Sequence, residues 1–115
     1  MKNIVLYVDE KGKSQVEEYC KVYVLNNDKN SKINQNKIND YLNALRYGGV
    51  KIGYPYVKYL KNKIWELRSL DNRILFFETS ERYVMLNAFK KTNIKNSFKG
   101  NWKGKNINEK IYWKE

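Results

Sequence analysis

The chain has 115 residues, of which 42% are hydrophobic and 30% charged, so its length and composition favour one globular domain and exclude a disordered tail. The formal net charge is +11, from 23 Lys and Arg against 12 Asp and Glu, and a strongly positive field favours nucleic acid or another polyanion. The absence of histidine excludes Ser-His-Asp and Cys-His catalytic sites as well as His-ligated zinc.

The sequence also indicates where the protein works. No run approaches the roughly 18 apolar residues that a membrane helix needs, and the N-terminal residues do not resemble a secretory signal. Cys20 is the one cysteine, which excludes a disulfide framework and fits a reducing compartment. We therefore expect a cytoplasmic protein with no membrane partner, no metal and no cofactor.

The first half predicts a strand followed by two helices. Residues 3–8 are rich in β-branched and aromatic side chains, as strands are. Ser14 and Glu17 match a capping box that opens a helix over 14–25. A second helix is expected over 31–47, with Ser31 as its cap and an apolar face that includes Ile38 and Leu45. Two such helices predict an antiparallel hairpin lying across a sheet.

The second half predicts strands. Apolar runs at 64–68, 74–77 and 83–89 are separated by short turns, and such short connections join antiparallel neighbours. Pro55 is expected in an extended segment before them. The fold class is therefore α+β: a strand, a two-helix hairpin, then an antiparallel three-strand meander over 1–92. Residues 93–115 are predicted to form an atypical basic tail that is either irregular or disordered.

Two arginines are predicted to face each other across one hairpin. Arg68 ends a strand and Arg73 begins the next, so both should lie on the same side of the sheet. Like charges placed opposite each other destabilise a sheet. Either neighbouring acids, Glu66 and Glu78, neutralise them or an anion does, and the sequence leaves both explanations open.

Strand alternation adds a candidate RNA site on the face away from the helices. With Arg68 and Arg73, a lysine after the last strand and one at the sheet edge would make a phosphate pocket. Aromatic side chains could stack a splayed base beside it. Without histidine, a lysine or a tyrosine would have to manage the proton of the RNA 2′-hydroxyl. The additional candidates are Lys58, Lys90, Lys91, Tyr56, Phe77 and Phe89.

As a set, four segments resemble the HigB branch of the RelE/ParE toxins, a family that includes phage-derived proteins. The resemblance covers roughly residues 2–92, and it is carried by residues 54–60 (YPYVKYL), 64–68 (IWELR), 71–76 (DNRILF) and 85–92 (MLNAFKKT). It implies the RelE-like α+β fold and a type II toxin–antitoxin toxin. Such a toxin is a ribosome-dependent endoribonuclease that cleaves mRNA, and a cognate antitoxin with a helix-turn-helix domain neutralises it.

The resemblance also implies roles for particular residues. Arg68, Arg73 and Lys91 match the family's basic catalytic positions. Glu66 stands where the RelE branch often has a lysine, and Tyr112 lies too far along the chain to align with the family's C-terminal tyrosine. HigB-like relatives usually continue into a T-P-x-x-E-I helix, whereas residues 93–102 here read NIKNSFKGNW.

These departures keep two further interpretations open. The chain could be a non-catalytic member of the same fold that binds only antitoxin or RNA. It could also be a generic basic RNA-binding protein, whose binding would depend steeply on salt concentration.

Overall fold

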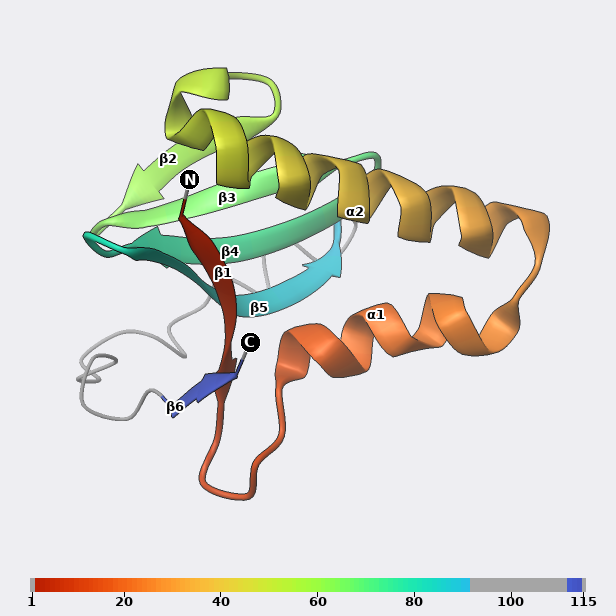
Figure 1. Ribbon diagram of the computed structural model, residues 1–115. Helices are drawn as coiled ribbons and strands as arrows, with labels where there is room; N and C mark the ends of the chain where they lie inside the picture. The colour runs from red at the N-terminus through yellow and green to blue at the C-terminus, as the bar shows by residue number, and fades with distance from the viewer. Residues whose placement is uncertain (1, 92–111, 115) are drawn as a thin grey trace.

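A helical hairpin lies across one face of a single sheet in the computed structural model, which describes residues 2–91 and 112–114 (Figure 1). The strand order is β2-β3-β4-β5-β1-β6. The elements are β1 (Asn3–Val8), α1 (Gln15–Asn26), α2 (Lys29–Gly48), the 3-10 helix η1 (Gly49–Ile52), β2 (Val57–Lys61), β3 (Ile64–Ser69), β4 (Asn72–Glu78), β5 (Arg82–Lys90) and β6 (Tyr112–Lys114). No helix within the described ranges is both long and apolar enough to span a membrane.

The predicted α+β fold class is confirmed, with two additions to the sheet. The meander has four antiparallel strands instead of three, because β2 precedes the predicted ones. The N-terminal strand β1 is not an edge strand, since it pairs in parallel with β5 and antiparallel with β6. The predicted irregular tail lies mostly outside the described residues, and β6 is the part of it that is described.

Side-chain caps fix where both helices begin. The Ser14 hydroxyl accepts a hydrogen bond from the Glu17 amide at 3.1 Å, as the capping box predicts. The prediction that Ser31 caps the second helix is wrong: Asp28 accepts from the Ser31 amide at 2.7 Å. An aspartate is at least as good a cap as serine, so α2 begins earlier than predicted and Ser31 is buried inside its first turn.

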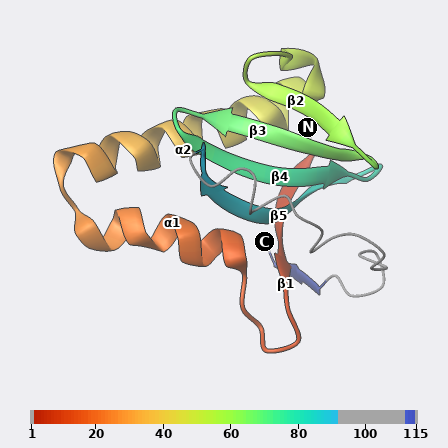
Figure 2. The same ribbon diagram turned by 180° about the vertical axis from the view of Figure 1, so that it is seen from behind.

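Apolar side chains fill both faces of the sheet. Between the sheet and the helices, the core is formed by Val16, Tyr23, Ile38, Leu45, Val57, Leu67, Ile74, Phe76, Tyr83, Met85 and Ala88. A second cluster, formed by Val5, Ile64, Leu75, Phe77, Val84, Leu86 and Phe89, lies on the other face, which Figure 2 turns toward the viewer. The predicted alternation in β3 and β4 is thereby confirmed, since Leu67 and Ile74 face the helices whereas Leu75 and Phe77 face away.

A polar network is buried within the helix-facing core. Asn72 is fully buried, and its side-chain oxygen accepts hydrogen bonds from the hydroxyls of Tyr19 at 2.5 Å and Tyr23 at 2.6 Å. Its amide nitrogen donates to Asn34 Oδ1 at 2.8 Å. Burial, and then the hydrogen bond to Tyr23, raise the pKa of Tyr19, so this phenol stays protonated. The network joins both helices to the first residue of β4.

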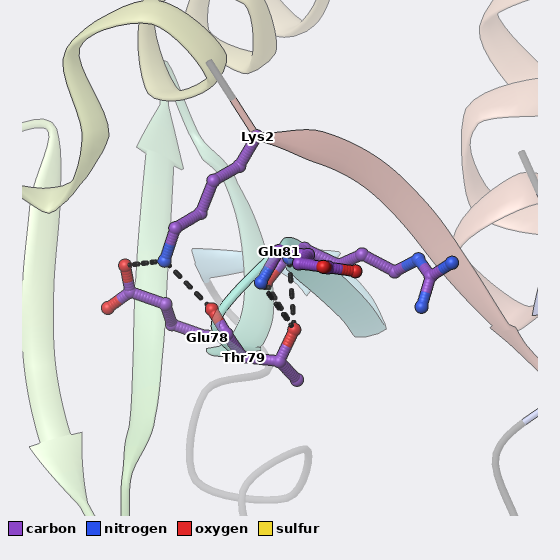
Figure 3. A network of polar contacts seen from close by, with 5 residues as sticks. Lys2, Glu78, Thr79 and Glu81 are labelled. Carbon is purple, nitrogen blue, oxygen red and sulfur yellow. Dashed lines mark hydrogen bonds and ion pairs between the residues drawn. The ribbon is translucent and has the colours of Figure 1, made fainter.

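A second network fastens the N-terminus to the turn between β4 and β5 (Figure 3). The Lys2 ammonium donates to the Glu78 carboxylate and, at 2.8 Å, to the Thr79 carbonyl. The Thr79 hydroxyl accepts from the Arg82 amide at 2.9 Å. These contacts hold the start of β1 beside the start of β5, where the two strands run parallel.

The segment before β2 is a turn, which corrects the prediction of an extended segment. The Tyr56 amide donates to the Gly53 carbonyl at 3.0 Å, closing the chain around Pro55. Gly53 has a φ of +72°, which favours glycine. This turn brings Tyr54 close to β3.

Replacing Asn72 with alanine should destabilise the fold, because the hydroxyls of two tyrosines and the side-chain oxygen of Asn34 lose the partner that they share. Each buried polar group left unsatisfied costs about 1–3 kcal/mol, so we expect the free energy of unfolding to fall by at least about 2 kcal/mol in urea denaturation. Asn39→Ala is the control, because Asn39 is exposed on the same helix as Asn34 and should change stability by less than about 0.5 kcal/mol. Equal stability of Asn72→Ala and wild type would contradict the role given to the network.

Candidate nucleic-acid interface

The predicted arginine pair is present. Arg68 and Arg73 are direct cross-strand partners in the β3–β4 ladder, so their side chains leave the sheet on the same side. This is the side away from the helices, because the adjacent Leu67 and Ile74 point toward them. The connecting loop is shorter than predicted: Ser69 and Asn72 are themselves paired, and only Leu70 and Asp71 lie between the strands.

One buried carboxylate lies between the two guanidinium groups. Glu66 Oε1 is 3.8 Å from Arg68 Nε and 4.0 Å from Arg73 Nε. The side chains of Glu66 and Arg73 are each 4% exposed, whereas that of Arg68 is 24% exposed. The explanation that a neighbouring acid neutralises the pair is thus confirmed for Glu66 but not for Glu78, which binds Lys2. Asp71 in the β3–β4 turn also acts on Arg73, but with Lys58 opposite Glu66 the basic groups still outnumber the acidic ones.

Arg73 is also anchored to the turn that precedes it. Its Nη1 donates to the carbonyl oxygens of Leu70 at 2.7 Å and Asn72 at 3.0 Å. Leu70 adopts a left-handed φ of +56°, a conformation that is uncommon for a non-glycine residue. Burial, and then the positive charge of Arg68, lower the pKa of the Arg73 guanidinium, although arginine stays charged at any physiological pH.

The predicted lysines divide between the two sides of the sheet. Lys58 is the cross-strand partner of Glu66, which places it on the arginine side. Lys91 lies beside the β3–β4 turn, where its amide donates to the Asp71 carbonyl at 2.8 Å. Lys90 does not join them: its ammonium lies 5.8 Å from the centre of the Tyr23 ring, on the helix side.

The predicted aromatic residues are not placed as a stacking surface. Phe89 lies opposite Arg73 on the correct face, but it is only 5% exposed, and Phe77 is buried on the same face. Tyr56 is 45% exposed, but its ring packs edge-to-face on Tyr41 of α2, with ring centres 5.4 Å apart, rather than on the arginines.

Sequence reasoning missed the aromatic residue that does contact the arginines. The Arg68 guanidinium lies 5.3 Å from the centre of the Tyr54 ring. No spacing rule signals this contact, because it depends on the turn around Pro55.

The described residues show neither a group of side chains that could hold a metal ion nor a reactive thiol. Among them, no group of three or more Cys, Asp or Glu side chains is arranged to hold a metal ion. Burial raises the pKa of the Cys20 thiol, which keeps it in the less reactive protonated form. The basic groups on this face are suited to binding an anion.

Comparisons with known proteins agree with this architecture. The model of the family described as "Phage derived protein Gp49-like" matches residues 28–108, more than half of the chain. Among solved structures, the "YoeB-YefM complex from Staphylococcus aureus" has a similar fold, with a TM-score of 0.56 at 20% identity over 76% of this chain and 94% of that one. No curated protein sequence matches. On the family match, the chain belongs to the Gp49-like family of phage-derived proteins.

Proposed function

We propose that this protein is the toxin of a type II toxin–antitoxin system, of the HigB type, and that it cleaves mRNA on the ribosome. The observation that carries the proposal is the pair of arginines around the Glu66 carboxylate, on the face of the sheet away from the helices. The similarity of the fold to a structure whose name pairs YoeB with YefM supports it, as does membership of the Gp49-like family.

The two arginines, Glu66 and Lys91 can serve RNA cleavage as follows. Glu66 accepts the proton of the RNA 2′-hydroxyl, and the 2′-oxygen attacks the adjacent phosphorus to form a cyclic phosphate. Arg68 and Arg73 stabilise the charge that develops on the phosphate oxygens. Lys91, beside the turn that anchors Arg73, donates a proton to the departing 5′-oxygen. Glu66 thus takes the role that the sequence alone left to a lysine or a tyrosine.

The remaining candidates contribute to binding. Lys58, opposite Glu66, contacts the phosphate backbone, whereas Lys90 on the helix side adds only to the general positive field. Phe89 supports the site through packing, since it is 5% exposed, whereas Tyr56 is 45% exposed but packs on Tyr41 of α2. The partners are ribosome-bound mRNA and a cognate antitoxin with a helix-turn-helix domain, in the cytoplasm.

A second candidate function is supported by the burial of Arg73 and Glu66. Both side chains are 4% exposed, and the Arg73 guanidinium is already bonded to two carbonyls. In this alternative the ion pair only stabilises the sheet, and the protein is a non-catalytic member that binds antitoxin or RNA. The two functions differ in whether production of the protein cleaves mRNA.

Induced production of the wild type in a bacterial host should arrest growth, with cleavage of translated mRNA visible by primer extension. Arg68→Ala and Arg73→Lys should each reduce cleavage at least about 100-fold, because each removes a preorganised contact to the developing charge. Lys13→Ala is the control, since Lys13 is an exposed lysine outside the site and its loss should leave the arrest intact. Absence of both arrest and cleavage from a well-folded wild type would favour the non-catalytic function.

Glu66→Gln tests the assignment of the proton acceptor. This substitution keeps the size of the side chain and removes its charge, so we expect cleavage on translating ribosomes to fall about 100-fold or more. The free energy of unfolding should fall by about 3 kcal/mol, because two arginines lose their buried counterion. Affinity for RNA should not fall, since the site becomes more positive. Undiminished cleavage by Glu66→Gln would exclude Glu66 as the base.

A further inference from the structure

The contact between Tyr54 and Arg68 is unusual because the ring in it is open to solvent. Tyr54 is 72% exposed, and its ring centre lies 5.3 Å from Arg68 Cζ. Arg68 Nε also lies 3.8 Å from Glu66 Oε1. The guanidinium is thus close to both a ring and a carboxylate, while the ring itself remains largely uncovered.

An exposed ring beside a fixed positive charge has the two features that a single-stranded nucleic acid recognises. Bases stack on aromatic rings with a contribution of about 1–3 kcal/mol each, and nearby cations bind the adjoining phosphates. Of the aromatic residues predicted from the sequence, Phe89 is 5% exposed, and Tyr56, although 45% exposed, packs on Tyr41 of α2 rather than on the arginines. Among the described residues, Tyr54 is the exposed ring in contact with the arginine pair.

We propose that Tyr54 and Arg68 form a stacking site for one unpaired nucleobase of single-stranded RNA, with the adjoining phosphate bound by Arg68. The inference deepens the proposed function, because it rests on RNA being the ligand and names the residue that contacts a base. Stacking accepts any base, so the site adds affinity and fixes the path of the strand without reading its sequence.

A purely structural role for Tyr54 makes a different prediction. If the ring only holds Arg68 in place, removing it weakens contacts to phosphate and therefore lowers affinity for any polyanion. If the ring stacks on a base, removing it lowers affinity only for ligands that carry bases. A pair of ligands with equal charge separates these roles.

The experiment measures binding of the full chain to two fluorescently labelled oligomers by anisotropy. One is a short single-stranded RNA with 2′-O-methyl groups, which cannot be cleaved, and the other is an abasic 2′-O-methyl ribose-phosphate chain of the same length. Tyr54→Ala should weaken binding of the first about 5- to 150-fold, the equivalent of 1–3 kcal/mol, and leave binding of the abasic oligomer unchanged. Tyr54→Phe should bind both as the wild type does.

The chain provides a matched control in Tyr47. This tyrosine is also 72% exposed and lies beside an arginine, with its ring centre 5.9 Å from Arg46 Cζ, but it is on α2 and away from Glu66. Tyr47→Ala should leave both affinities unchanged. The inference fails if Tyr54→Ala weakens both oligomers equally, if it weakens neither, or if the wild type does not prefer the oligomer that carries bases.

These outcomes are separable from failure of the proposed function. If the wild type neither arrests growth nor cleaves mRNA, but shows Tyr54-dependent binding of the base-containing oligomer, the nuclease proposal fails and the stacking site stands. If the wild type cleaves mRNA and Tyr54→Ala binds both oligomers as the wild type does, only the stacking site is overturned.

Discussion

The mutual repulsion of Arg68 and Arg73 is the constraint on which this face of the sheet depends. Their cross-strand register forces the two side chains to the same side, and Glu66 supplies the charge that makes this tolerable. A buried carboxylate is itself costly unless it is paired, so none of the three groups is stable here without the others. Asp71 also acts on Arg73, but with Lys58 opposite Glu66 the basic groups outnumber the acidic ones, and a phosphate near Arg68 would balance the excess.

Asn72 couples this cluster to the hydrophobic core. Its carbonyl accepts from Arg73 on one side of the sheet, while its side chain binds Tyr19, Tyr23 and Asn34 on the other. The packing of the helical hairpin therefore helps to fix the turn that anchors Arg73. A change in how the hairpin packs would be transmitted to Arg73 through Asn72.

The parts of the site that local rules control could be predicted from the sequence. Alternation along two strands joined by a short turn sets register and face, so the pairing of Arg68 with Arg73 and the position of Glu66 followed directly. The edge strand β2 was missed because Lys58, Tyr59 and Lys61 are exposed and give no apolar pattern. The burial of Asn72 and the contact of Tyr54 with Arg68 depend on packing between distant segments, for which the sequence carries no periodic signal.

The structure also changes the explanation for why arginine rather than lysine stands at positions 68 and 73. In a chain with 19 lysines and four arginines, the use of arginine at these positions would favour phosphate binding. Yet Arg73 donates from Nη1 to two carbonyls while its Nε lies near a carboxylate, and Arg68 lies near both a ring and the same carboxylate. Lysine could not make these contacts together, so folding alone accounts for the choice of arginine. The argument for RNA binding rests instead on two features that the fold does not require, the excess positive charge around Glu66 and the exposed ring of Tyr54.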